Sequence, residues 1–235
     1  MVKLNYVIFD FAGTLAILNP SREKILKSLL ESVGISNRSD SEILNAYLLA
    51  DSIMVYSSVE ESRNTLYKDD FCSEYNRFIL HTLRLKDLIE LNKVNDAFKL
   101  SGSHWEPASD AVQALNRLTQ AGVQFGVLSN FGAELSDLIA KIFNHQVQFS
   151  HIVDSSSIGL EKPNVEFFEY FISLIGFHVR NCVFVGDSVT LDYEPAMEIG
   201  INTYLVDRTL VDPTPAFNRF PSLTEIVERV LSTSV

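Results

Sequence analysis

The sequence predicts an α/β protein: a doubly wound parallel sheet in three layers, with a block of helices inserted after the first strand. Short apolar runs recur along the chain and end at polar residues, which is typical of strands buried on both faces of a parallel sheet. Patterns with helical spacing separate these runs, as expected for a doubly wound sheet. Residues 18–100 interrupt that alternation and carry the inserted helices.

The strands and helices of the expected core follow in order along the chain. Strands are expected at residues 6–9, 123–128, 182–185 and 203–206, with a weaker one at 151–153. Helices are expected after Pro107 with Gly122 as the end signal, at 135–142, after Pro163 with Gly176 as the end signal, and after the capping box formed by Ser222 and Glu225. We interpret residues 207–221 as a loop.

The inserted segment, residues 18–100, is rich in Leu, Ile, Tyr and Phe at helical spacing and lacks convincing strands. We expect about four helices there. The chain then returns to the core near residues 101–103. The expected organisation is therefore a core of residues 1–17 and 101–235 and a helical insertion of residues 18–100.

Composition and charge narrow the class of protein. The chain has 235 residues, of which 46% are hydrophobic and 21% charged, as in an ordinary globular protein. Its formal net charge of −11 argues against nucleic acid or an anionic membrane as a partner. No stretch reaches about 18 unbroken apolar residues, so we expect no membrane span and a cytoplasmic protein. The cysteines, Cys72 and Cys182, are expected to be buried thiols in a reducing compartment.

Polar residues follow four of the apolar runs, where ligands bind in open α/β sheets. Asp10 ends the first run and precedes Gly13 and Thr14, which favours a carboxylate beside backbone N–H groups that can hold an anion; a solvated turn is the alternative. Ser129 and Asn130 end the second, although such pairs are often helix caps.

The other two sets are a lysine and a pair of acids. Lys162 precedes a helix start, where the helix dipole disfavours its charge unless an anion lies between them; a solvated lysine is the alternative. Asp187 and Asp192 follow the strand at 182–185 and suit a hard cation with oxygen ligands, such as Mg²⁺.

In type and order these four motifs resemble those of the haloacid dehalogenase superfamily. The resemblance covers residues 7–15 and 107–207, and the motif GDSVTLDYEPAMEIGI at 186–201 is long and specific. It implies a Rossmann-like core, a helical cap of the family's first type at 18–100, Mg²⁺ as cofactor and a phosphorylated small molecule as substrate. We expect a monomer or a homodimer.

The resemblance also implies a role for each matched residue. Asp10 would be the nucleophile and would form an aspartyl-phosphate. The side chains of Ser129 and Lys162 would hold the phosphoryl oxygens. The remaining roles are implied for backbone groups and acids: the N–H groups of Phe11, Ala12 and Asn130 for phosphate, Asp10, the carbonyl of Ala12 and Asp187 for Mg²⁺, and Asp192 as a support for the metal or for Lys162.

Ala12 departs from the family's phosphatases, which carry a second aspartate two residues after the nucleophile. That aspartate protonates the leaving group and then activates water. General acid–base catalysis of this kind contributes about 10²–10⁴-fold to the rate. Alanine cannot transfer a proton, so Ala12 casts doubt on ordinary hydrolysis of phosphate monoesters.

Four hypotheses follow from Ala12. The chain is a phosphohydrolase in which water or a cap side chain replaces the acid, or whose substrate, such as an acyl phosphate, needs none. It is similar to phosphonoacetaldehyde hydrolases, which carry alanine here and use a cap lysine. It is a binding or regulatory protein that keeps the phosphate and metal site. Or it is a 2-haloacid dehalogenase, although that class lacks the acidic motif at Gly186 and Asp187.

The inserted segment offers candidates for substrate specificity. Its arginines could hold a second anionic group, although solvated helix faces are the more common role of such residues: Arg22, Arg63, Arg77 and Arg84. Its tyrosines could stack on a ring, although packing is more common: Tyr47, Tyr56, Tyr67 and Tyr75.

Overall fold

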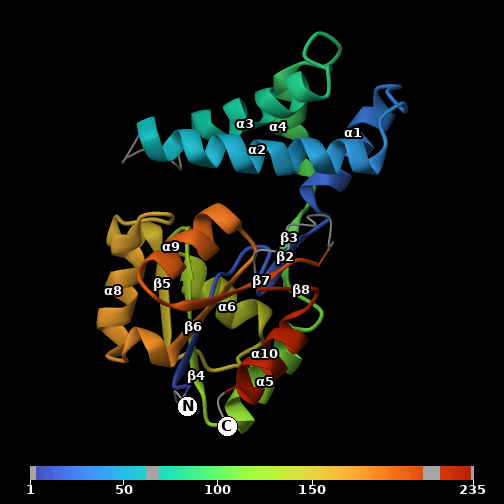
Figure 1. Cartoon of the computed structure of the whole chain (residues 1–235). Coiled ribbons are helices and arrows are strands. Elements are labelled where there is room, and N and C mark those ends of the chain that lie inside the picture. The colour runs from blue at the N-terminus through green and yellow to red at the C-terminus, as the bar shows by residue number, and fades with distance from the viewer. Residues whose placement is uncertain (1–3, 62–68, 209–217, 234–235) are drawn as a thin grey trace. The chain divides into compact units, whose positions relative to one another are not determined.

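The computed structural model describes residues 4–61, 69–208 and 218–233 and divides the chain into two compact units (Figure 1). The core unit comprises Met1–Ile17 and Trp105–Val235, and the helical unit comprises Leu18–His104. The first division falls at the expected position, between Ile17 and Leu18. The second falls after His104, four residues later than the expected end of the insertion at Leu100.

A six-stranded sheet forms the middle of the core unit, in the order β5-β4-β1-β6-β7-β8. Its strands are β1 (Tyr6–Phe9), β4 (Gln124–Ser129), β5 (His151–Asp154), β6 (Cys182–Gly186), β7 (Asn202–Val206) and β8 (Arg219–Phe220). All neighbouring strands run parallel. Strand β1 lies between β4 and β6, with Phe9 opposite Val127 and Val185. The strand order reverses direction at β1, and ligands bind at such a point in open sheets.

Helices cover both faces of this sheet (Figure 1). The helices of the core unit are α5 (Ala111–Gln120), α6 (Leu135–Ile142), α7 (Ser155–Ile158), α8 (Val165–Ile175), α9 (Glu194–Glu198) and α10 (Leu223–Ser232). One apolar cluster joins Phe9 and Val127 to helices α5, α6 and α10. A second joins Ile8 and Phe184 to α8 and α9. The alternation of these strand residues between the two clusters confirms the three-layer, doubly wound arrangement.

Several residues that the sequence predicts to begin or end helices do so in the structure. Asn164 accepts from the N–H of Glu166 at the start of α8, and Gly176 ends that helix with φ of 69°. At the start of α10, Ser222 Oγ accepts from the N–H of Glu225 and donates to Glu225 Oε1 at 3.3 Å, so the expected pair of Ser222 and Glu225 forms at this cap. The side chains of Asn164 and Ser222 satisfy N–H groups that a helix N-terminus leaves without an intrahelical partner.

Other expectations at the edges of elements are wrong. Pro107 does not start a helix: it ends β3 (His104–Pro107), which pairs with β2 (Ala16–Asn19), and α5 begins at Ala111. The interval 207–221 is not only a loop, because Arg219 and Phe220 form β8 at the edge of the sheet. These strands are short, and β2, β3 and β8 are for the most part not buried, so they lack the continuous apolar run that marks a buried strand.

The described part of the helical unit contains α1 (Arg22–Ser32), α2 (Asp40–Glu61), α3 (Asp69–Thr82) and α4 (Leu91–Leu100). These match the expected number of helices. They share a core of their own, in which Leu26 of α1, Tyr47 of α2 and Ile79 of α3 are almost completely buried. The unit therefore packs around its own apolar centre.

Among the described residues, no helix has the length and apolar character needed to cross a membrane. Cys182 is a buried free thiol on β6, as expected. The side chain of Cys72 lies outside the described residues.

Candidate active site

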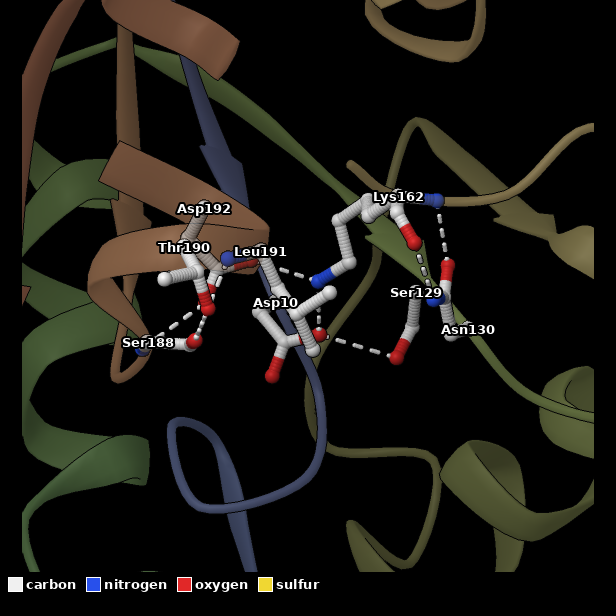
Figure 2. A network of polar contacts seen from close by, with 8 residues as sticks. All are labelled: Asp10, Ser129, Asn130, Lys162, Ser188, Thr190, Leu191 and Asp192. Carbon is white, nitrogen blue, oxygen red and sulfur yellow. Dashed lines mark hydrogen bonds and ion pairs between the residues drawn. The ribbon is translucent and has the colours of Figure 1, made fainter. Parts of the chain in front are cut away.

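Asp10 lies directly after β1, the central strand from which the sheet order diverges, and is only 4% exposed. Its Oδ1 atom accepts hydrogen bonds from Ser129 Oγ at 2.9 Å and from Lys162 Nζ at 2.6 Å (Figure 2). Within the described ranges no residue donates to its second oxygen, Oδ2. One carboxylate oxygen is thus fixed by two donors while the other is left for a ligand.

Lys162 is buried and joins the acids of two strand ends. Its Nζ atom contacts Asp10 Oδ1 and Asp192 Oδ1, both at 2.6 Å. Burial by itself lowers the pKa of Lys162, but the charges and hydrogen bonds of these carboxylates outweigh it, so the pKa lies above its ordinary value. The solvated-lysine alternative is wrong, since Lys162 is 2% exposed. Its charge meets two carboxylates rather than the start of α8.

Asp192 is committed to holding Lys162 and the segment after β6. Its Oδ1 accepts from Lys162, and its Oδ2 accepts from the N–H of Ser188 at 3.0 Å. Burial raises the pKa of the Asp192 carboxyl, while Lys162 opposes that shift. A Cβ atom on Gly186 would lie 2.3 Å from Asp192 Cγ, so only glycine leaves room for this carboxylate. Asp192 thus lies where a supporting residue for Lys162 would be expected.

Ser129 and Asn130 fix the second strand end rather than capping a helix. Ser129 donates to Asp10, as described above. The side chain of Asn130 donates to the carbonyl oxygen of Lys162 at 2.8 Å and accepts from the N–H of Lys162 at 2.7 Å. This reciprocal pair holds the backbone at Lys162 beside β4, which explains how the lysine reaches Asp10 from a distant part of the sequence.

Asp187 is the exposed acid of the site. Its carboxylate lies against Gly13, where an added Cβ atom would be 2.1 Å from Asp187 Oδ2. Gly13 has a φ of 82°, a left-handed conformation that side chains rarely adopt, and so glycine serves both the turn and the approach of Asp187. Asp10, Asp187 and Asp192 each place a carboxylate oxygen within 4.8 Å of the other two.

This donor set fits a divalent cation with oxygen ligands. Three carboxylates and one lysine carry a formal charge of −3 + 1 = −2 within that small region. Asp192 uses both oxygens for Lys162 and Ser188, so a cation at this cluster would bind chiefly through the carboxylates of Asp10 and Asp187. A hard cation such as Mg²⁺ binds one or two carboxylates and keeps several waters, which matches this set.

The turn after Asp10 supplies backbone groups but no acid. The N–H groups of Gly13 and Ala16 bond to backbone carbonyls. No described residue accepts from the N–H of Phe11 or of Ala12. Ala12 is half-buried, and its methyl group packs on the apolar cluster of α5, α6 and α10. The turn can therefore bind an anion through N–H groups, but the side chain at position 12 cannot transfer a proton.

A clamp on this turn was missed by the sequence analysis. Arg208, two residues after β7, donates to the carbonyl oxygen of Thr14 at 2.9 Å and to Asp110 at 2.8 Å. Asp110 also accepts from the N–H of Leu223 at the start of α10. Polar residues directly after a strand end were the available signal, but we interpreted residues 207–221 only as a loop.

The specificity candidates of the helical unit have separate outcomes. Arg22 pairs with Asp51 and lies over the ring of Tyr47, and Arg77 pairs with Glu74. No described side chain pairs with Arg84, which has a φ of 55°. Three candidates lie outside the described residues or side chains: Tyr56, Arg63 and Tyr67.

Comparisons with known proteins agree with this geometry. The family of haloacid dehalogenase-like hydrolases matches residues 4–200 of the chain. The chain is 29% identical to haloacid dehalogenase-like hydrolase domain-containing protein 3 of Xenopus laevis, over 54% of each. It is 30% identical to a glyceraldehyde 3-phosphate phosphatase of Methanocaldococcus jannaschii, over 41% of this chain and 42% of that protein. The matched region thus spans about half the length of these curated relatives.

Solved structures share the fold. The putative HAD-hydrolase YfnB from Bacillus subtilis is similar with a TM-score of 0.67 at 19% identity, covering 97% of this chain and 99% of that one. Identity this low shows the fold alone. Because the family match spans most of the chain, and the site has the expected order of strand-end residues, the chain belongs to the haloacid dehalogenase-like hydrolase family.

Proposed function

We propose that this chain is an Mg²⁺-dependent phosphohydrolase that acts on a phosphorylated small molecule through an aspartyl-phosphate on Asp10. The observation that carries the proposal is the arrangement around Asp10: one oxygen is held by Ser129 and Lys162, and the other receives no described hydrogen bond. The likeness to a glyceraldehyde 3-phosphate phosphatase supports a phosphorylated small metabolite as the substrate class.

Bond formation begins at Asp10. Oδ2 attacks the phosphorus atom of the substrate, and the bond between phosphorus and the leaving-group oxygen breaks. Lys162 and Ser129 lie beside the nucleophile and would hold the phosphoryl oxygens, together with the N–H groups of Phe11, Ala12 and Asn130. Water then attacks phosphorus, which releases inorganic phosphate and restores the carboxylate.

Asp10, Asp187 and the carbonyl oxygen of Ala12 would hold Mg²⁺. When bound, the cation supplies neutralising charge between the carboxylates and the phosphoryl group. Two observations support this assignment: the excess of carboxylates over cationic groups in the site, and the magnesium bound to the Bacillus subtilis neighbour named above. Lys162 alone offsets only one of the three carboxylate charges.

Because Ala12 cannot donate a proton, we expect the rate of the first step to depend on the leaving group of the substrate. A leaving alcohol needs a proton, and a positioned acid contributes about 10²–10⁴-fold to such a step. A leaving carboxylate is stable without a proton, so with an acyl phosphate the formation of the aspartyl-phosphate does not need the missing acid. The second step, attack by water, still lacks a base at position 12. We therefore expect acyl phosphates to react faster than alkyl phosphates, with slow release of phosphate from Asp10.

A non-catalytic phosphate-binding protein is the second candidate, and Ala12 is the observation that favours it. A binding protein would keep the charges of Asp10, Lys162 and Asp187 without needing the acid. The other two hypotheses fit less well. A haloacid dehalogenase does not need the acidic cluster that includes Asp187. A phosphonate hydrolase of the kind named above needs a cap lysine, and no lysine of residues 18–100 lies in a stretch that matches the lysine motif of that family.

The test is phosphate release in Mg²⁺ from acetyl phosphate, a panel of alkyl phosphates and phosphonoacetaldehyde. The chain would be compared with Asp10→Asn and Ala12→Asp. The proposal predicts turnover of the acyl phosphate, its loss in Asp10→Asn, and a gain of alkyl phosphate hydrolysis in Ala12→Asp. No turnover by either the chain or Ala12→Asp would contradict it and leave the binding protein as the better account.

A further inference from the structure

A cavity of about 380 Å³ lies in the core unit beside the start of α6, outside the polar network around Asp10. Its lining consists of two aromatic residues, one leucine and three charged residues: Trp105, Phe131, Leu138, Glu134, Asp137 and Lys141. The volume is within the range of small-molecule sites. None of these residues has a role in the function proposed above.

The apolar wall of the cavity is a fixed cluster of rings. The ring centroids of Trp105 and Phe131 are 5.8 Å apart, and both pack on Phe11, at 5.5 Å and 5.3 Å. Phe11 is fully buried, so the two lining rings rest on the apolar core. A rigid wall of this kind presents aromatic surface to a ligand with little loss of side-chain entropy.

The charged wall carries an excess of negative charge. Glu134 is the N-cap residue of α6, and Asp137 and Lys141 lie on that helix; the formal charges of the three sum to −1 − 1 + 1 = −1. All three are exposed, and within the described ranges no hydrogen bond or ion pair joins the side chain of any of them to another residue. Aromatic faces together with unpaired carboxylates are the features that attract an organic cation.

The cavity is built on the same loop as the phosphoryl-binding residues. Phe131 follows Asn130, whose side chain is paired with the backbone of Lys162. The carbonyl oxygen of Phe131 accepts from Ser155 Oγ and from the N–H of Ser156, both at 3.3 Å. This loop is therefore held in place on both sides. A group bound against Phe131 would lie next to the segment that carries Ser129.

From these contacts we infer that the cavity binds a small organic ammonium group, with the cation against Trp105 and Phe131 and its charge facing Glu134 and Asp137. The inference that the cavity binds an ammonium group does not depend on the proposed function. Resting on the proposed function, the inference also names the substrate class: a phosphate compound whose leaving portion carries a positive charge.

Trp105 is the only tryptophan in the sequence, so indole fluorescence reports directly on the cavity. Choline, a quaternary ammonium alcohol, would be titrated at constant ionic strength against 3,3-dimethylbutan-1-ol, its neutral isostere. The expected result is a change of Trp105 emission with a dissociation constant for choline about tenfold lower than for the isostere, from cation–π and charge attraction together. The double variant Glu134→Gln/Asp137→Asn should remove this preference. Equal affinity for the two probes, or a preference that survives in the double variant, would overturn the inference.

A kinetic measurement tests the substrate class separately. The chain would be given choline phosphate and 3,3-dimethylbutyl phosphate in Mg²⁺, with Ala12→Asp as a second enzyme in case the natural chain is slow on esters. The expected kcat/KM is about tenfold higher for the cationic ester, and the double variant should lose that ratio. Hydrolysis of both esters at equal rates would overturn the substrate class while leaving the proposed function intact. Choline binding without hydrolysis of any phosphate compound would instead contradict the proposed function and leave the cation site standing.

Discussion

Two clusters of charged residues, one in each unit, show how burial changes the contribution of an ion pair to stability. In the core unit, Lys162 contacts Asp10 and Asp192, and these side chains are 1–6% exposed. In the helical unit, Arg22 contacts Asp51 through two nitrogens, and both side chains are 38% exposed. Both clusters have short contacts between a cationic nitrogen and carboxylate oxygens, but only the cluster around Lys162 is shielded from solvent. We expect the loss of one partner to be costly in the first cluster and mild in the second.

The two clusters also differ in what could be seen from the sequence. Asp10, Lys162 and Asp192 each follow or precede a recognisable core element, and their order along the chain matches a known family. Asp51 has no such signal, since it lies in the middle of the long helix α2. Sequence patterns therefore identified the residues of the buried cluster one by one but could not pair Arg22 with Asp51.

The largest expected effect is the difference in stability loss between removing the cation of the buried cluster and removing that of the exposed cluster. Lys162→Met leaves two buried carboxylates without their shared cation and should lower the free energy of unfolding by about 3–5 kcal/mol. Arg22→Met should lower it by at most about 1 kcal/mol because solvent screens Asp51. Urea unfolding followed by circular dichroism and by Trp105 fluorescence measures both. Equal losses in the two variants would break the comparison.

Alanine substitutions at two glycines distinguish the cost of backbone strain from the effect of a disturbed metal site. Gly13 and Gly34 have φ values of 82° and 81°, but only an alanine at position 13 would collide with Asp187. Both substitutions should cost about 1–2 kcal/mol of left-handed strain. Gly13→Ala should in addition weaken Mg²⁺ binding by about tenfold or more, as expected when ligand geometry is disturbed.

The measurements for this pair are thermal unfolding and a titration of Mg²⁺ by isothermal calorimetry. Gly34→Ala is the control for strain and should bind Mg²⁺ like the unaltered chain. Undiminished Mg²⁺ affinity in Gly13→Ala would show that Asp187 does not need its place against Gly13.

Arg208 and Asp110 provide an intermediate case, with side chains 28% and 15% exposed. Arg208→Met should lower the free energy of unfolding by about 1–2 kcal/mol, between the losses for Arg22 and Lys162, because it removes charge-assisted bonds to Asp110 and to the Thr14 carbonyl. Urea unfolding tests the rank. A loss as large as that of Lys162→Met would mean that burial does not set the order.

The smallest expected effect concerns the thiol of Cys182. Burial raises its pKa from an ordinary value of 9.0 to about 11. Since the folded chain holds this proton more tightly, the thiol contributes stability below pH 9 that is lost as the pH rises toward about 11. In a Cys72→Ser background, Cys182 should react with a thiol reagent far more slowly than a free cysteine at pH 8. Rapid labelling under native conditions would contradict the burial of this residue.

The sequence predicted the core well because each buried strand of four or more residues has a clear apolar run and a polar residue at its end. The short strands β2, β3 and β8 escaped detection, since pairing rather than periodicity defines them. The strand-end residues were found individually, but their contacts were not. In particular, the pairing of Asn130 with the Lys162 backbone and the clamp of Arg208 on Thr14 depend on tertiary contacts between distant segments.

The central claim is that Asp10 takes up a phosphoryl group, and trapping that group tests it most directly. The chain would be mixed with acetyl phosphate and Mg²⁺, quenched in acid and examined by mass spectrometry of its peptides. Because Ala12 offers no base for the second step, we predict that a phosphoryl group accumulates on Asp10, declines in Ala12→Asp and is absent in Asp10→Asn. An unmodified Asp10, or a phosphoryl group on a different residue, would contradict the account.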